Sequence, residues 1–230
     1  MLRSVILDFD GVITDSEVLH LRAFNRVLAR FNVEISTKDY YQKYLGLNDV
    51  DCFRTLIKNS ILKTNERQIR GLVEQKNLIF EELARTEGRT IPGVREFLQM
   101  LAQNKIPMAI CSGALRTEIE MLLEEGGLRH FFCVIISAEQ VKKGKPDPEG
   151  FLLTLERLNK GRENPIEGSE CIVIEDSHWG LEAAKAADMH TIAVTNTYDA
   201  EQLNQAEKIV SGLNELTINE LQQLCISDSV

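Results

Sequence analysis

Residues 4–15 read SVILDFDGVITD, a short apolar run that ends abruptly in acidic residues. The run from Ser4 to Leu7 is typical of a buried strand, and Asp8 and Asp10 follow it two positions apart. Side chains two apart in a strand point to the same face, so these carboxylates would repel each other unless a positive charge lies between them. Gly11 allows a sharp turn and a close approach of a ligand to the backbone. The segment predicts either a cation site or an ordinary strand-to-turn junction, in which Asp and Gly are common.

Three more apolar runs end in polar residues along the chain. Ser112 and Gly113 follow residues 107–111, Lys145 comes within one loop of residues 134–136, and Glu175 and Asp176 follow residues 171–174. In an open parallel sheet the ligand crevice lies beyond the carboxyl ends of the strands, so these loops are expected to meet there. Clustered carboxylates suit Mg²⁺, whereas a lysine and a hydroxyl bind phosphoryl oxygens.

The order of the predicted elements favours an α/β protein with a doubly wound parallel sheet, a Rossmann-like core, and an inserted all-α domain. From residue 91 to the end, strands and helices alternate: helices near 94–103, 117–125, 148–158, 180–187 and 216–224, strands at 107–111, 134–136, 171–174 and 191–194, and a short strand near 209. The preceding block has helical spacing only, with apolar residues at helical spacing over 21–31 and helices near 37–44 (with Thr37 as its N-cap), 49–59 and 65–86. The predicted domains are therefore a core of residues 1–15 and 89–230 and a helical domain of residues 16–88.

Composition limits the classes of function. The chain has 230 residues and a net charge of −9, which argues against a general nucleic-acid interface, since such interfaces need clustered Lys and Arg. No apolar stretch approaches the roughly 20 residues of a membrane helix and no leader-like segment opens the chain, so a cytoplasmic protein with no membrane partner is expected. The five cysteines contain no Cys-x-x-Cys pair and are predicted to be reduced thiols, mostly buried.

The motifs together resemble the haloacid dehalogenase superfamily of phosphotransferases, in the branch of β-phosphoglucomutase and phosphoglycolate phosphatase. Residues 8–12, Asp-Phe-Asp-Gly-Val, look like its first motif and Ser112 like its second. Lys145 in Gly-Lys-Pro-Asp-Pro looks like the third motif, and residues 175–177, Glu-Asp-Ser, like the fourth. The resemblance covers nearly the whole chain, and it implies that the helical insertion is a mobile cap that closes over the site.

The resemblance also implies roles for the core residues. Asp8 would be the nucleophile that forms an aspartyl phosphate, and Asp10 the general acid and base, with its backbone carbonyl as a metal ligand. Asp176 would bind Mg²⁺ directly, with Glu175 beside it as a ligand or through water. Lys145, Ser112 and Gly113 would bind the phosphate.

Each of these residues also has an alternative reading. Asp8 could be a metal ligand only, and Asp176 and Ser177 could cap the following helix. Lys145 could be one solvated member of a basic loop that also holds Lys142 and Lys143.

Two residues of the helical block are further candidates for substrate binding. Lys76 lies within the apolar stripe of its helix, four residues from both Leu72 and Phe80, so it either extends to water or serves a site. It resembles a substrate-facing lysine of the cap. His20 follows the first motif closely, and it is either a packing residue or one that faces the active site.

One departure from the mutase branch concerns the loop after Gly46, where that branch has an arginine for a second phosphate. This chain has Leu-Asn-Asp-Val-Asp at residues 47–51, and the nearest arginine is Arg54. Asp49 and Asp51 are expected to repel a second phosphate.

The predicted function is therefore a Mg²⁺-dependent phosphatase for a small phosphorylated metabolite, either a sugar phosphate or a phosphoglycolate-like compound. A phosphosugar mutase and a non-catalytic phosphometabolite-binding module are the alternatives. A true dehalogenase is disfavoured because that chemistry needs no metal, whereas this chain carries Asp10 and the Glu175–Asp176 pair.

Overall fold

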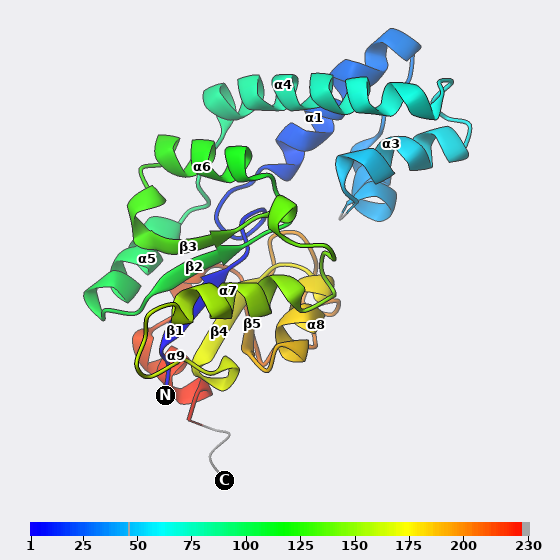
Figure 1. Cartoon of the computed structure of the whole chain (residues 1–230). Helices are drawn as coiled ribbons and strands as arrows, with labels where there is room; N and C mark the ends of the chain where they lie inside the picture. Colours follow the sequence, from blue (N-terminus) through cyan, green and yellow to red (C-terminus); the bar gives the residue numbers. More distant parts are fainter. Residues whose placement is uncertain (46, 227–230) are drawn as a thin grey trace. The chain divides into compact units, whose positions relative to one another are not determined.

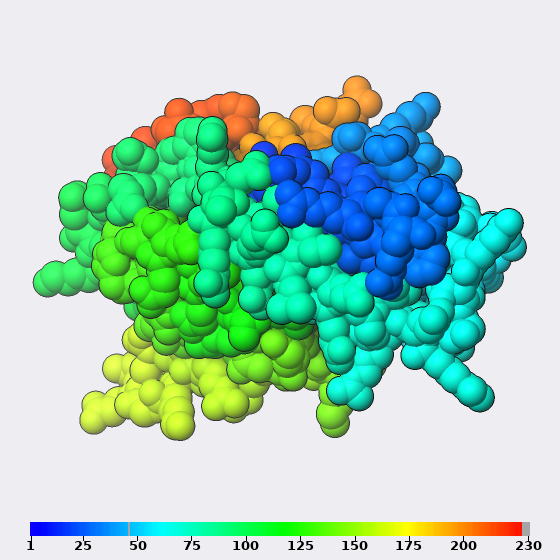
Figure 2. Space-filling view, turned by 90° about the horizontal axis from the view of Figure 1, so that it is seen from above, coloured from blue at the N-terminus to red at the C-terminus, as the bar shows by residue number. Residues whose placement is uncertain are grey.

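The computed structural model describes residues 1–45 and 47–226. The chain forms two compact units: Met1–Asp15 with Arg89–Val230, called the core unit, and Ser16–Gly88, called the helical unit (Figure 1). The space-filling view shows surface from both, with the helical unit in blue to cyan and the core unit largely in green to red (Figure 2).

The core unit is built on a six-stranded parallel sheet in the order β3-β2-β1-β4-β5-β6. The strands are β1 (Ser4–Leu7), β2 (Met108–Cys111), β3 (Phe132–Ile136), β4 (Cys171–Glu175), β5 (His190–Val194) and β6 (Lys208–Val210). Every residue of β1, β2, β4 and β5 is buried, as expected for a parallel sheet with both faces covered. The chain moves outward from β1 to β3 on one side and from β4 to β6 on the other. The strand order therefore reverses between β1 and β4, where ligands bind in such sheets.

The predicted α/β fold is confirmed, with differences of one or two residues at the ends of β2, β3, β4 and β5. β3 begins at Phe132, two residues before the predicted start, because Phe132 pairs with Met108 across a register shift. Glu175 is the last residue of β4 and pairs with Ala193, although the sequence predicted it in the following loop. Its backbone is therefore fixed by pairing within the sheet.

The helices of the core unit are α5 (Val94–Gln103), α6 (Arg116–Glu125), α7 (Glu149–Asn159), α8 (His178–Ala186) and α9 (Ile218–Leu224). Helices α7 and α8 pack on each other and on the sheet, with Phe151, Ala183 and Ala184 in one apolar cluster with Ile6. Helix α9 begins later than predicted because Thr217 caps it by accepting from the Glu220 N–H.

The helical unit contains α1 (Glu17–Leu28), α2 (Thr37–Asp39), a π-helical turn at Tyr40–Tyr44, α3 (Asp49–Lys58) and α4 (Ile69–Glu87), with short 3₁₀ turns at Ala29–Phe31 and Glu66–Gln68. Phe24 and Phe53 meet edge to face at 5.2 Å in its apolar core. The prediction of Thr37 as N-cap is wrong. Ser36 caps α2, because its extended backbone lets its hydroxyl accept the Asp39 N–H.

Among the residues described, no helix combines the length and the apolar character that a membrane span requires. All five cysteines are free thiols, and only Cys133 is exposed.

Candidate active site

The carboxyl ends of three neighbouring strands bring the predicted core residues together. Asp8 directly follows β1, Ser112 follows β2, and Glu175 and Asp176 end and follow β4. Because β1 lies between β2 and β4, these side chains share one edge of the sheet. Lys145 reaches the same edge from the loop that follows β3.

Lys145 is the cation of this cluster. Its Nζ lies 2.7 Å from Asp8 Oδ1 and 2.5 Å from Glu175 Oε1, and it donates to the Cys111 carbonyl at 3.1 Å. The ammonium also lies 5.4 Å from the centre of the Phe151 ring. Burial by itself lowers the pKa of Lys145, but the Asp8 and Glu175 carboxylates outweigh it and raise the pKa well above its usual value. Lys145 is therefore a permanent charge inside the site and not a solvated member of the basic loop.

Asp8, Glu175 and Asp176 form a buried carboxylate cluster whose ligand atoms all lie within 4.8 Å of one another. Burial raises the pKa of Glu175 to about 7; Lys145 lowers it in part and Asp8 raises it further. Burial, then Asp8 and Glu175, raise the pKa of Asp176 well above its ordinary value. Three ionised carboxylates against one ammonium leave two negative charges, which a divalent cation would balance. Oxygen-only ligands of this kind fit Mg²⁺.

Two glycines make room for these carboxylates. Gly11 has φ of +74°, and a Cβ there would lie 1.8 Å from Asp176 Oδ2. A Cβ at Gly180 would lie 1.9 Å from the carboxyl carbon of Glu175. Both carboxylates are thus packed directly against backbone, which limits the positions they can take.

Ser177, and not Asp176, caps helix α8. Its hydroxyl accepts the Gly180 N–H at 3.1 Å and donates to Glu175 Oε2 at 2.9 Å. The capping alternative therefore applies to Ser177 alone, and the Asp176 carboxylate belongs to the acidic cluster.

The Ser112 loop lies at the same edge of the sheet and has an accessible backbone. The buried Ser112 hydroxyl accepts the Ala114 N–H at 2.9 Å, which leaves its own proton to donate to a phosphoryl oxygen. Gly113 is exposed, and a Cβ placed there would meet nothing within 4 Å. The loop backbone is therefore accessible to a ligand.

Asp10 lies in the turn after Asp8 and is half-buried. Gly11 donates its N–H to the Thr14 carbonyl at 2.8 Å, which closes this turn. Within the described part of the chain, the acidic cluster includes the carboxylates of Asp8, Glu175 and Asp176 but not that of Asp10. The Asp10 carboxylate is thus not one of the three that form this cluster.

Sequence reasoning missed two residues of the loop after β5. Asn196 donates from Nδ2 to the Gly11 carbonyl at 2.7 Å, and Thr197 Oγ1 lies 2.7 Å from the place where a Cβ of Gly11 would stand, next to Asp176 Oδ2. Only their position in the sequence could have indicated a role at the site, because they too follow the carboxyl end of a strand. Asn and Thr are so common in loops that their identity alone does not distinguish them.

In the helical unit, the structure brings Lys76 and His20 together. Lys76 is 1% exposed, and its Nζ lies 2.7 Å from His20 Nδ1 and 3.0 Å from Asp49 Oδ2. His20 stacks on Phe80 with 4.0 Å between ring centres. Burial, then the Lys76 ammonium, lower the pKa of His20 well below its usual value. The reading in which Lys76 extends to water is wrong, because its head is buried between α1, α3 and α4.

The expected repulsion of a second phosphate by Asp49 and Asp51 needs correction. Asp49 pairs with Lys76, and Asp51 lies 3.2 Å from Arg54. Asp49 therefore has Lys76 as its partner, whereas Asp51 shares Arg54 with Glu66. Gly46, which precedes this loop, lies outside the described residues.

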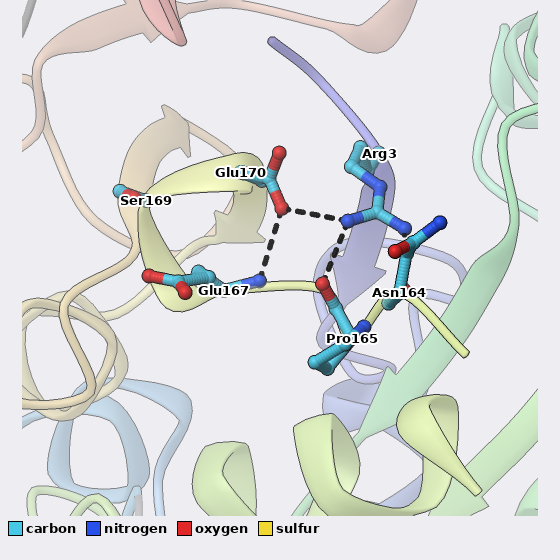
Figure 3. Close-up of a pocket in the computed structure, with 6 residues that line it drawn as sticks. All are labelled: Arg3, Asn164, Pro165, Glu167, Ser169 and Glu170. Atoms are coloured by element: carbon cyan, nitrogen blue, oxygen red, sulfur yellow. Dashed lines mark hydrogen bonds and ion pairs between the residues drawn. The ribbon is translucent and has the colours of Figure 1, made fainter. Parts of the chain in front are cut away.

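A shallow hollow at the other end of the sheet is polar but internally paired (Figure 3). Arg3 donates to Glu170 Oε2 at 3.0 Å and to the carbonyls of Pro165 and Asn164 at 2.7 and 2.8 Å. Arg3 and Glu170 immediately precede β1 and β4, so this hollow lies at the amino ends of the strands. Its contacts join the starts of two parallel strands and hold no cluster like that around Asp8.

Comparison with known proteins decides the family. The sequence model of haloacid dehalogenase-like hydrolases matches residues 5–194, which include all four motifs. The chain belongs to the haloacid dehalogenase-like hydrolase family. The resemblance inferred from the motifs is thereby confirmed.

Individual proteins are similar over most of the chain. A phosphorylated carbohydrates phosphatase of Thermotoga maritima is 31% identical over 97% of this chain and 100% of its own length. A fructose-1-phosphate phosphatase of Escherichia coli is 29% identical over 83% of this chain and 95% of its own. The crystal structure of a β-phosphoglucomutase from Clostridium difficile is similar with a TM-score of 0.83 at 25% identity, covering 99% of this chain and 98% of that one. This haloacid dehalogenase-like hydrolase is a phosphatase, as the sequence predicted.

Proposed function

We propose that this phosphatase is Mg²⁺-dependent and hydrolyses a small phosphorylated carbohydrate through an aspartyl-phosphate intermediate. The observation that carries the proposal is the buried cluster of Asp8, Glu175 and Asp176 around Lys145 Nζ. With all three carboxylates ionised, the cluster and Lys145 would carry two excess negative charges, which one Mg²⁺ held by these carboxylates and by the Asp10 backbone carbonyl would balance. When bound, Mg²⁺ would neutralise charge on the phosphoryl oxygens.

The chain's own residues divide the reaction into two steps. Asp8 attacks phosphorus, and Asp10 gives a proton to the leaving oxygen of the substrate. Asp10 then takes a proton from water, which attacks the aspartyl phosphate and releases inorganic phosphate. Lys145, the Ser112 hydroxyl and the N–H of Gly113 hold the phosphoryl oxygens throughout, so catalysis is mainly positioning and charge neutralisation.

The names of the relatives support a sugar phosphate over a phosphoglycolate-like compound. Two similar phosphatases are named for phosphorylated carbohydrates and for fructose 1-phosphate. Because a β-phosphoglucomutase has a similar structure, phosphosugar mutase activity is the alternative to hydrolysis. The two reactions differ in whether the phosphoenzyme transfers its phosphoryl group to water or to a sugar.

The test is phosphate release from a panel of sugar phosphates, with and without Mg²⁺, in the parent and in Asp8→Asn. Release should require Mg²⁺ and fall at least about 10⁴-fold in Asp8→Asn, because an amide is a poor nucleophile. Asp15→Asn is the matched control, since Asp15 is exposed and lies in the same segment. Turnover that survives Asp8→Asn would contradict the proposal, and transfer of phosphate to a sugar in place of water would favour the mutase.

We also propose that residues 1–15 and 89–230 form the catalytic domain and that residues 16–88 form a specificity cap. Buried Lys76, held by His20 and Asp49, supports a role in recognising the substrate. Lys76→Met should raise KM for the preferred sugar phosphate more than for p-nitrophenyl phosphate, which lacks a sugar. Equal losses on both substrates would argue against specificity.

The free cysteines agree with the proposed cytoplasmic location, where thiols stay reduced.

A further inference from the structure

Three aromatic side chains stand on two segments at the carboxyl edge of the sheet, next to the acidic cluster. His178 and Trp179 open helix α8 and follow Asp176 by two and three positions. Tyr198 belongs to the loop after β5 and directly follows Thr197. Because β4 and β5 are neighbours in the sheet, the two segments that follow them meet at this edge (Figure 1).

The rings of His178, Trp179 and Tyr198 form one cluster, called here the aromatic shelf. The His178 ring centre lies 4.0 Å from that of Trp179 and 5.3 Å from that of Tyr198. The Trp179 and Tyr198 rings meet edge to face, with 6.1 Å between their centres. Tyr198 also packs against a buried apolar cluster that includes Leu181 and Leu203, which fixes its place. All three residues are only half-buried, so the shelf keeps surface to offer a ligand.

The segments that carry the shelf also carry inner residues of the site. Asp176 Oδ2 lies against Gly11, 1.8 Å from the place where a Cβ would stand, and Thr197 Oγ1 lies 2.7 Å from the same place. His178 follows Asp176 by two residues and Tyr198 follows Thr197 by one. Two residues span at most about 7 Å of chain. The backbone of the shelf therefore lies close enough for one small ligand to touch both the acidic cluster and the rings.

The chemistry of the shelf fits a carbohydrate. One face of a sugar ring consists largely of C–H groups, which pack on aromatic faces, whereas the hydroxyls lie at the rim of the ring. Indole and phenol rings offer a large rigid apolar area with a polar atom at one end. A small-molecule site commonly combines such apolar walls with a few charged groups that fix one end of the ligand.

We propose that His178, Trp179 and Tyr198 bind the sugar ring of the substrate, and that they select ring-form sugar phosphates over short acyclic phosphoesters. This role rests on the proposed function, in which Asp8 and its neighbours bind the phosphoryl group. The shelf adds a binding contact and takes part in no chemical step.

The first test uses the fluorescence of Trp179, which is the single tryptophan of the chain and so reports on the shelf alone. The Asp8→Asn protein, which should bind substrate without turnover, is titrated in the presence of Mg²⁺. The ligands are inorganic phosphate and a panel of ring-form sugar phosphates that includes glucose 6-phosphate and fructose 1-phosphate, with binding followed in parallel by calorimetry. We expect the emission to change on saturation with the sugar phosphates that bind, and to change little with inorganic phosphate. An equal change with inorganic phosphate, no change with a bound sugar phosphate, or binding of no sugar phosphate would overturn the inference.

The second test compares the kinetics of the parent with those of Trp179→Leu. KM for the preferred ring-form sugar phosphate should rise about five- to tenfold, as expected for the loss of one aromatic contact, while kcat changes less than about twofold. KM for glycerol 3-phosphate, which has no ring, should stay near the parental value. Trp179→Phe should restore most of the lost affinity. Parental KM for the sugar phosphate in Trp179→Leu, or an equal rise for glycerol 3-phosphate, would overturn the inference.

Phe131→Leu is the matched control. Phe131 also follows a histidine, with 4.1 Å between its ring centre and that of His130, but this pair directly precedes β3 and so lies at the opposite edge of the sheet. The control should leave both KM values unchanged. If Trp179→Leu does not fold, the fluorescence titration of the intact shelf decides alone.

Failure of the shelf and failure of the proposed function give different results. A parent that releases phosphate only from acyclic phosphoesters would overturn the shelf and leave the phosphatase activity in place. A protein whose Trp179 emission responds to sugar phosphates, but whose parent releases no phosphate, would contradict the proposed function and support the shelf.

Discussion

Gly11→Ala is the sharpest test of the packing at the site, because the size of its effect can be worked out from distances in the structure. The new Cβ would lie 1.8 Å from Asp176 Oδ2, whereas ordinary contact begins at 3.4 Å, so the carboxylate must move by roughly 1.5 Å. The φ of +74° adds backbone strain of about 1–2 kcal/mol for any residue with a side chain. A misplacement of about 1 Å in a catalytic site costs on the order of 100-fold in rate.

The assay is steady-state hydrolysis of p-nitrophenyl phosphate at several Mg²⁺ concentrations, together with urea unfolding of the metal-free protein. We expect kcat/KM to fall at least about 100-fold and the free energy of unfolding to fall by about 1–3 kcal/mol. Gly71→Ala is the matched control, since Gly71 lies in helix α4 and a Cβ there meets nothing within 4 Å. It should leave activity unchanged and slightly stabilise the protein. Gly11→Ala with parental activity would refute the account of Asp176 packed against the backbone.

Two further predictions follow from the same contacts. The Glu149 carboxylate accepts hydrogen bonds from the backbone N–H groups of Lys142 and Lys143 at 2.9 and 3.1 Å, so it orders the loop that carries Lys145. Glu149→Ala should therefore lower kcat about tenfold. An unchanged kcat would contradict this role. Burial holds the pKa of His20 below its unfolded value of 6.5, so the neutral form contributes stability above that pH that is lost as pH falls. Urea unfolding between about pH 8 and 5 should therefore show a loss of stability toward acid that is smaller in His20→Gln, and equal slopes in the two proteins would contradict the assignment.

Much of the core unit was predictable because its information is local. Apolar runs of four or five residues predict buried strands, and acidic or hydroxyl residues directly after them predict a site at the carboxyl edge. Asp8, Ser112 and Asp176 each stand at the end of such a run, which is why the fold and the family could be inferred together.

The sequence alone determined the parallel sheet, its helical insertion and the residue types that meet at its edge. Only the tertiary structure decided which charges pair. Lys145 binds Asp8 across 137 residues, whereas Lys142 and Lys143 have the same chemistry and lie within three positions of it. Lys76 is a buried partner of Asp49, and Asn196 donates to the Gly11 carbonyl from the far side of the sequence. A sequence pattern contains the periodicity of residue types and their neighbours along the chain. The strength of an ion pair or hydrogen bond depends instead on the distance between the groups and on their burial. Those quantities exist only once the chain has folded.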